Sequence, residues 1–111
     1  MKLKQAFQAF AFAASACLLA APAQAQDYPN KPVTIVVGYA AGGGVDFIAR
    51  LLAEKLADRL KQPVLVENRP SVGAVVASTY VSKAKPDGYT LMMGAPGPIV
   101  FNHALNDKLP Y

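Results

Sequence analysis

Cysteine, histidine and tryptophan are scarce in this chain of 111 residues, which has one cysteine, one histidine and no tryptophan. Cys17 lies in an apolar segment near the N-terminus, and a chain that loses this segment has no cysteine left. That loss excludes disulfide bonds, thiolate metal sites and cysteine nucleophiles. His103 stands alone, and no cluster of His, Asp or Glu has the spacing of metal ligands. We therefore expect no metal and no cofactor.

A long membrane-spanning run is also missing. The first 25 residues instead have the pattern of a cleavable signal peptide, with two lysines, an apolar stretch over residues 7–21, and Ala23-Gln24-Ala25 as the small-x-small cleavage site. The stretch is shorter than the about 20 apolar residues of a transmembrane helix, so a retained anchor is the weaker alternative. Lipidation at Cys17 is disfavoured because apolar residues continue beyond it. We expect export and a mature chain of residues 26–111.

Charge of one sign is not concentrated anywhere in the chain. Lys and Arg number 11 and Asp and Glu number 7, which gives +4, and loss of Lys2 and Lys4 with the signal peptide lowers this charge to +2. The chain has no basic run with interleaved aromatic residues, the pattern of a nucleic-acid-binding surface. We therefore expect no nucleic-acid partner.

The mature chain alternates between strand-like and helix-like segments. Val33-Thr34-Ile35-Val36-Val37 is a β-branched run of the kind buried in a parallel sheet. Asp46 is predicted to be the N-cap of a helix that ends at Gln62-Pro63. On this helix one apolar stripe comprises Phe47, Ile48, Leu51, Leu52, Leu56 and Leu60. The other predicted elements are a strand over 64–66, a helix over 74–84, a strand over 89–93 and the start of a helix over 99–105.

The order of these elements, β-α-β-α-β with short connections, predicts parallel pairing and right-handed crossovers. We therefore assign the mature chain to the α/β class, as a parallel-sheet half-domain. The 86 residues from 26 to 111 suffice for one small domain with a modest core.

Three glycine-rich loops follow the three predicted strands, over residues 38–45, 67–73 and 94–98. The carboxyl ends of parallel strands meet at one edge of a sheet, and open α/β sheets bind their ligands at that edge. Gly42-Gly43-Gly44 lets a ligand approach bare backbone beside the unpaired N–H groups of a helix start, which suits an anion such as a carboxylate. The alternative is that these glycines only permit a tight turn.

Nucleotide binding and catalysis find little support in these loops. No Gly-Lys-Ser/Thr follows the glycines, and the six residues 42–47 lack the third glycine of a dinucleotide fingerprint. Ser71 and His103 have no evident catalytic partner in the sequence, and Glu67 with Arg69 indicates a local ion pair. We therefore expect no enzymatic activity.

Four segments of the mature chain match a known family in their order and spacing. They are Tyr28-Pro29-Asn30-Lys31-Pro32, Gly42-Gly43 with Asp46 and Ile48-Ala49-Arg50, Val66-Glu67-Asn68-Arg69-Pro70, and Lys85-Pro86-Asp87-Gly88-Tyr89-Thr90-Leu91. Because of these four segments, the chain from Tyr28 to Tyr111 resembles the N-terminal part of the proteins of the Bug family. These are the periplasmic solute-binding proteins of tripartite tricarboxylate transporters.

The resemblance implies a type II periplasmic-binding-protein-like fold of two hinged domains, with residues 26–111 as the N-terminal part of the first. It implies a periplasmic location and the capture of small organic carboxylates, largely through backbone amides and waters. It also implies the membrane subunits of a tripartite tricarboxylate-type transporter as partners. The family's ligand loops correspond here to Tyr39, Ala41, Gly42, Gly43 and Asp46, to Ser71, Gly73, Ala74 and Val75, and to Ala95 and Gly97.

Departures from the family pattern make the predicted pocket wall more apolar. Ala40-Ala41 and Val45 replace a proline pair and a threonine, and Val75 stands where the family usually has asparagine. Ala95 and Pro98 replace residues that carry hydroxyl groups. We therefore expect an aromatic or otherwise less polar acid as the ligand.

Length is the largest departure from the family. The chain is much shorter than a family member and lacks the second domain, so we expect a truncated binding protein. One alternative is a small exported interaction module that pairs through an exposed sheet edge. Another is a non-functional remnant without ligand binding.

Overall fold

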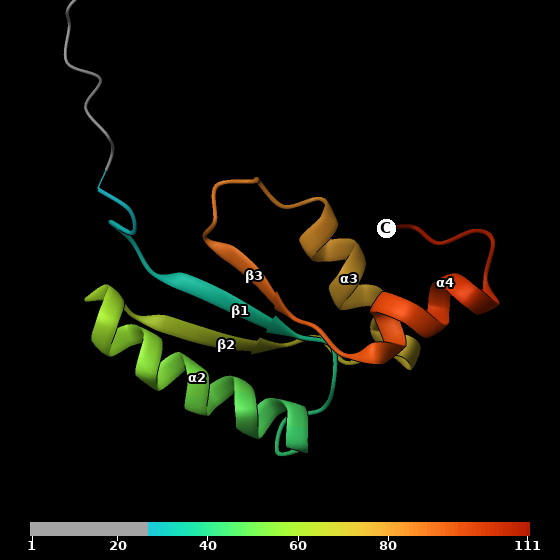
Figure 1. Cartoon of the computed structure of the whole chain (residues 1–111), viewed down its shortest axis with the longest axis horizontal. Coiled ribbons are helices and arrows are strands. Elements are labelled where there is room, and N and C mark those ends of the chain that lie inside the picture. Colours follow the sequence, from blue (N-terminus) through green and yellow to red (C-terminus); the bar gives the residue numbers. More distant parts are fainter. Residues whose placement is uncertain (1–26) are drawn as a thin grey trace, which may run out of the picture.

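The computed structural model describes residues 27–111, so the expected signal peptide over residues 1–25 lies outside the described residues. The described chain folds around a parallel sheet of three strands, β1 (Val33–Val37), β2 (Val64–Asn68) and β3 (Thr90–Met93). The strand order is β2-β1-β3 (Figure 1). Within residues 27–111, none of the helices combines the length and the apolar character needed to span a bilayer.

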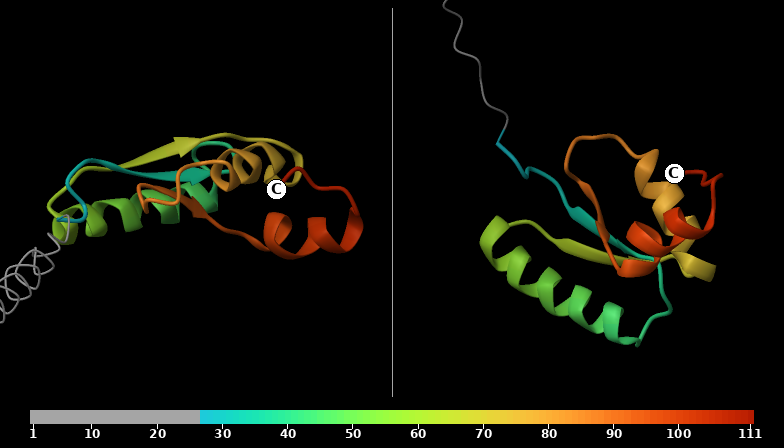
Figure 2. Two further views of the ribbon diagram at one scale, coloured as in Figure 1. Left: turned by 90° about the horizontal axis from the view of Figure 1, so that it is seen from above. Right: turned by 45° about the vertical axis from the view of Figure 1, so that its right-hand side comes forward.

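Helices connect and follow these strands. Helix α2 (Gly44–Leu60) joins β1 to β2, and a 3-10 turn η1 (Val72–Ala74) with helix α3 (Val75–Ser82) joins β2 to β3. A π-helical turn η2 (Gly97–Phe101) and the short helix α4 (Asn102–Leu105) follow β3. Figure 2 shows η2 and α4 beyond the carboxyl ends of the strands. The α/β class and the β-α-β-α-β order predicted from the sequence are confirmed.

The sheet has helices on both of its faces. Ile35 and Val37 of β1 form a buried cluster with Ala49 and Ala53 of α2, and Val36, which points to the opposite face of the strand, is also buried. Helix α2 packs against β1 and β2, whereas α3 packs against β1 and β3, and Figure 1 shows the two helices on either side of the strands. This arrangement places a topological switch point between β1 and β3, where the chain connections diverge.

The apolar stripe of α2 is mostly exposed. Phe47, Ile48, Leu51 and Leu52 are 67%, 54%, 50% and 42% exposed. The buried face carries the small residues Ala49 and Ala53, flanked by the partly buried Val45 and Leu56. A hydrophobicity pattern gives most weight to large apolar side chains. Close packing of a helix on a sheet instead favours small residues such as alanine, four residues apart on the contact face.

The start of α2 also differs from the prediction. The N-cap is Gly43, without a side-chain cap, and Asp46 is the third helical residue. The carboxylate of Asp46 instead accepts a hydrogen bond from the N–H of Gly42, at 2.8 Å. Such an acidic residue satisfies a free donor of the preceding loop, as the third residue of a capping box does.

Several other boundaries shift by a few residues. Strand β2 continues through Glu67 and Asn68 because these residues pair with Val36 and Val37 of β1. The expected helix over 74–84 is a helix over 75–82 preceded by a 3-10 turn. Its start is set by the left-handed conformation of Gly73 and Ala74, whose φ angles are 60° and 57°.

The contact between the end of β1 and the start of α3 is tight. A Cβ atom added at Gly38 would lie 2.3 Å from the Cβ of Ala74 and 3.2 Å from the Cβ of Ala77. Ala74 is fully buried. Only glycine at position 38 therefore lets α3 approach the sheet this closely.

We predict that Gly38→Ala lowers the free energy of unfolding by about 1–3 kcal/mol, the usual cost of overpacking a core. In the double variant Gly38→Ala/Ala74→Gly, the loss should be smaller than the sum of the two single losses, because the clashing methyl group is gone. Urea denaturation measures both effects. As a control, Gly44→Ala adds a Cβ that meets nothing within 4 Å, and it should not lower stability. Additive losses in the double variant would contradict the proposed contact.

Candidate functional site

The three glycine-rich loops lie at one edge of the sheet, as predicted. Each follows the carboxyl end of a parallel strand, after Val37, after Asn68 and after Met93. The loops after β1 and β3 border the switch point, where open α/β sheets bind ligands. We call this region the carboxyl edge.

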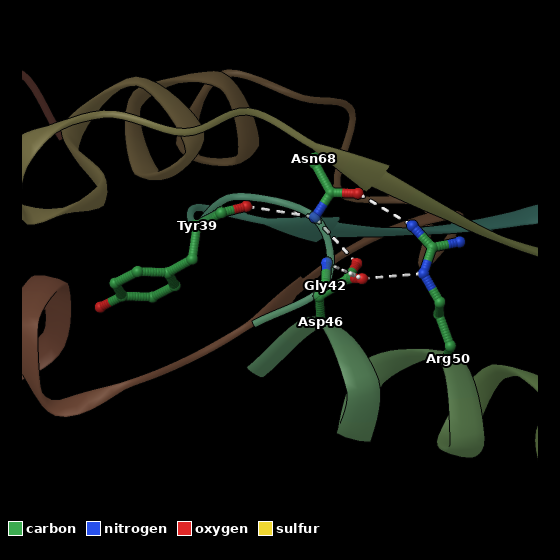
Figure 3. Close-up of polar contacts among 5 residues, drawn as sticks. All are labelled: Tyr39, Gly42, Asp46, Arg50 and Asn68. Atoms are coloured by element: carbon green, nitrogen blue, oxygen red, sulfur yellow. Dashed lines mark hydrogen bonds and ion pairs between the residues drawn. The ribbon is translucent and has the colours of Figure 1, made fainter. Parts of the chain in front are cut away.

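The carboxylate of Asp46 holds the first loop in place (Figure 3). Its Oδ2 accepts hydrogen bonds from the N–H of Gly42 at 2.8 Å and from Nε of Arg50 at 2.9 Å. Its Oδ1 accepts a hydrogen bond from Nδ2 of Asn68 at 2.9 Å. The side chain of Asp46 is only 3% exposed. The carboxylate therefore binds groups of its own chain on both oxygens.

Asn68 joins this cluster to the end of β2. Its Nδ2 also donates to the carbonyl oxygen of Tyr39 at 3.1 Å, and its Oδ1 accepts a hydrogen bond from Nη2 of Arg50 at 3.0 Å. Asp46, Arg50 and Asn68 together tie the first loop to α2 and β2. Sequence reasoning did not assign a role to Asn68 or Arg50. The spacing of four residues between Asp46 and Arg50 is the one local signal for their ion pair.

The charge of this cluster is balanced. The hydrogen bond from Arg50, then those from Gly42 and Asn68, hold the pKa of Asp46 well below its ordinary value, against the effect of burial. The same carboxylate raises the pKa of Arg50 above its ordinary value. Both side chains are therefore charged near neutral pH, and the pair adds no net charge at the start of α2.

The second and third loops are joined by Asn102 of α4. Its Nδ2 donates to the carbonyl oxygen of Gly73 at 2.8 Å and lies 2.8 Å from the hydroxyl of Tyr111. That hydroxyl donates to the carbonyl oxygen of Pro98 at 3.0 Å. A Cβ at Gly73 would lie 2.7 Å from Oδ1 of Asn102, so glycine permits this close contact. Sequence reasoning did not single out Asn102, since nothing local marks a contact with the second loop.

The side chain of Tyr39, in the first loop, lies beside the third loop. A Cβ at Gly97 would lie 3.1 Å from the hydroxyl of Tyr39, so the two residues are neighbours. Figure 3 shows the Tyr39 side chain pointing away from the Asp46 cluster. The hydroxyl of Ser71, by contrast, accepts a hydrogen bond from the N–H of Val76 at 3.0 Å. Among the polar side chains predicted to bind ligand, Asp46 and Ser71 are thus already engaged within the chain.

The eleven predicted ligand residues differ in exposure. Asp46 and Ala74 are buried. Exposed backbone lies at Ala41, Gly42 and Gly43, and partial exposure is found at Tyr39, Ser71, Gly73, Val75, Ala95 and Gly97. The edge therefore offers mainly backbone groups, a phenol and apolar side chains to a ligand.

We predict a specific acid response from Asp46. Because its pKa is lowered in the folded chain, the carboxylate stabilises the fold above about pH 4, and this contribution is lost progressively as the pH falls below that value. Asp46→Asn should lower the urea midpoint at pH 7 and flatten its decline below about pH 4. The control Asp58→Asn, at an exposed position of α2, should keep the parent decline. An equal decline in all three proteins would show that Asp46 does not hold the loop.

Known proteins resemble this chain in sequence. A family model described as "Tripartite tricarboxylate transporter family receptor" matches residues 48–111. The protein BugT of Bordetella pertussis is 38% identical over 94 residues, which cover 84% of this chain and 29% of BugT.

Solved structures resemble it as well. Rpa4515 of R. palustris, described with adipate, has a TM-score of 0.72 and 34% identity over 76% of this chain and 28% of that protein. MatC of Rhodopseudomonas palustris, described with bound malate, has a TM-score of 0.56 and 43% identity over 59% of this chain and 22% of that protein. The chain thus spans between 22% and 29% of the length of these three proteins.

Proposed function

Because this chain belongs to the tripartite tricarboxylate transporter family of receptors, we propose that it captures small organic carboxylates as part of a periplasmic solute-binding protein. In this proposal residues 1–25 direct export, and residues 26–111 form the N-terminal part of the first of two domains. The partners are the membrane subunits of a tripartite tricarboxylate-type transporter. The observation that carries the proposal is the convergence of three loops at the carboxyl edge, where two of them border the switch point.

The start of α2 has the chemistry of an anion site. The first-turn N–H groups of a helix have no partner within the helix, and the helix dipole makes this end partially positive. Gly42, Gly43 and Gly44 leave the backbone beside these groups bare of side chains. Arg50 balances the charge of Asp46, so the nearby carboxylate does not cancel the attraction for a ligand anion.

Similar proteins support carboxylates as the ligand class. Two similar solved structures are described with ligands, adipate and malate, which are both dicarboxylates. The edge of this chain adds apolar groups, since Val72 is 96% exposed and Val75 and Ala95 are partly exposed. An apolar wall beside backbone donors favours an acid with an aromatic or aliphatic body.

The contacts of the serine and histidine side chains support binding rather than catalysis. Ser71 accepts a hydrogen bond from a backbone N–H, and the hydroxyl of Ser78 donates to the carbonyl oxygen of Ala74 at 2.9 Å. His103 packs edge-on against the ring of Tyr111, with 5.6 Å between the ring centroids. Within residues 27–111 these side chains form no pair of nucleophile and base.

We predict that the purified chain binds adipate, malate or benzoate, with the strongest binding for the least polar acid that fits. Isothermal titration and thermal shift measure this binding. Gly42→Ala should weaken it about tenfold, a loss of about 1.4 kcal/mol, because the φ angle of Gly42 is 84° and alanine disfavours that conformation.

The matched control is Gly88→Ala, which also places alanine at a positive φ angle, here 80°, but lies in the turn before β3, away from the carboxyl edge. It should change the affinity far less. A preference for malate over the less polar acids would contradict the apolar wall. A cooperative unfolding transition without any shift by an acid would overturn carboxylate capture by this chain and favour an interaction module with an open sheet edge.

A further inference from the structure

A groove of about 720 Å³ lies beside α3, apart from the centre of the carboxyl edge. Helix α3 contributes Thr79 and Tyr80 to one wall, together with its C-cap residue Lys83. The segments that lead into β1 and β3 contribute Lys31, Lys85 and Tyr89. Its volume is in the range of small-molecule pockets, about 300–1,000 Å³. Val75 is its only lining residue that also belongs to the predicted ligand loops.

The groove is positively charged. Three lysines and one aspartate line it, an excess of two positive charges. Lys31 lies 3.5 Å from the carboxylate of Asp87 and 4.2 Å from the ring centroid of Tyr89. Lys83 and Lys85 take part in none of the ion pairs found within residues 27–111. Their ammonium groups are therefore available to an anion.

A buried hydroxyl also belongs to this groove. Oγ1 of Thr79 is buried and has no hydrogen-bond partner within the described residues. A buried polar group without a partner costs stability, and such groups are uncommon in folded proteins. Because this oxygen is buried, a ligand with a hydrogen-bonding group satisfies it only when the surrounding groove wall shifts to admit that group.

The aromatic walls are held in place before any ligand binds. The guanidinium of Arg69 lies 3.7 Å from the ring centroid of Tyr80. The hydroxyl of Tyr89 accepts a hydrogen bond from the N–H of Asn30 at 2.9 Å and donates to its side-chain oxygen at 3.0 Å. Walls fixed in this way reduce the ordering cost that binding must overcome.

We propose that this groove is a second binding site, for an amphipathic organic anion. The apolar body of the ligand occupies the space beside the two tyrosines, its acidic group pairs with Lys83 and Lys85, and the hydroxyl of Thr79 gains a partner. The site is distinct from the carboxylate site proposed at the carboxyl edge, and it does not depend on that proposal.

The test uses 8-anilinonaphthalene-1-sulfonate as the probe, with its fluorescence followed during titration of the purified chain. Lys83→Gln/Lys85→Gln should weaken binding at least about fivefold, because two favourable charges are lost. The control Lys55→Gln/Lys61→Gln removes the same charge from the C-terminal half of α2 and from its C-cap, and it should stay within about twofold of the parent. Circular dichroism confirms that each variant unfolds cooperatively. Equal binding by all three proteins would assign the probe to the exposed apolar side of α2 and overturn the proposal.

Thr79→Val provides a second, independent readout. Valine has nearly the shape of threonine without the hydroxyl, so the unliganded variant should melt at a higher temperature than the parent. Its affinity for the probe should nevertheless fall. A higher melting temperature with unchanged affinity would show that the hydroxyl serves no ligand, and it would overturn this part of the site. Neither lysine variant should change the thermal shift that adipate causes. This measurement separates a failure of the groove proposal from a failure of the proposed carboxylate site at the carboxyl edge.

Discussion

The arrangement of the carboxyl edge depends on the buried carboxylate of Asp46. A buried charge is tolerated only when it is paired and hydrogen-bonded, and Arg50, Asn68 and the N–H of Gly42 meet that requirement. These three partners come from the same helix, from the end of β2 and from the first loop. One side chain thereby fixes the loop relative to the sheet and leaves the start of α2 with little net charge. The glycines can then present bare backbone in a defined conformation.

Small residues determine how closely the helices approach the sheet. Ala49 and Ala53 bring α2 against β1, while Gly38 makes room for Ala74 at the start of α3. The same packing turns the larger side chains of α2 outward, with Phe47 67% exposed. The core is consequently thin, and many large apolar side chains of the described residues are exposed to solvent. The groove beside α3 lies between this helix and the segments that lead into β1 and β3.

Much of the fold was predictable because its signals are local. The β-branched run over 33–37 and the three glycine-rich loops each depend on residues adjacent in sequence. The strand over 33–37 is confirmed, and each loop follows a strand as predicted, although the helices and β2 take up part of each predicted range. Family membership was predictable for the same reason, since its four motifs are short. The apolar stripe of α2 did not identify the side of the helix that packs on the sheet, because small residues, Ala49 and Ala53, make that contact. The cap at Asp46 was predicted wrongly because its carboxylate finds better partners within the cluster.

The sequence by itself determined the class, the order of elements and the edge at which the loops meet, because helix and strand periodicity and turn chemistry act over a few residues. Only the tertiary structure decided which polar groups at that edge are already engaged. Asn68 reaches Asp46 across 22 residues and Asn102 reaches Gly73 across 29. Such contacts follow from strand register and helix placement, which no local pattern records. The groove around Thr79 has the same origin, since its walls come from segments that only the parallel sheet brings together.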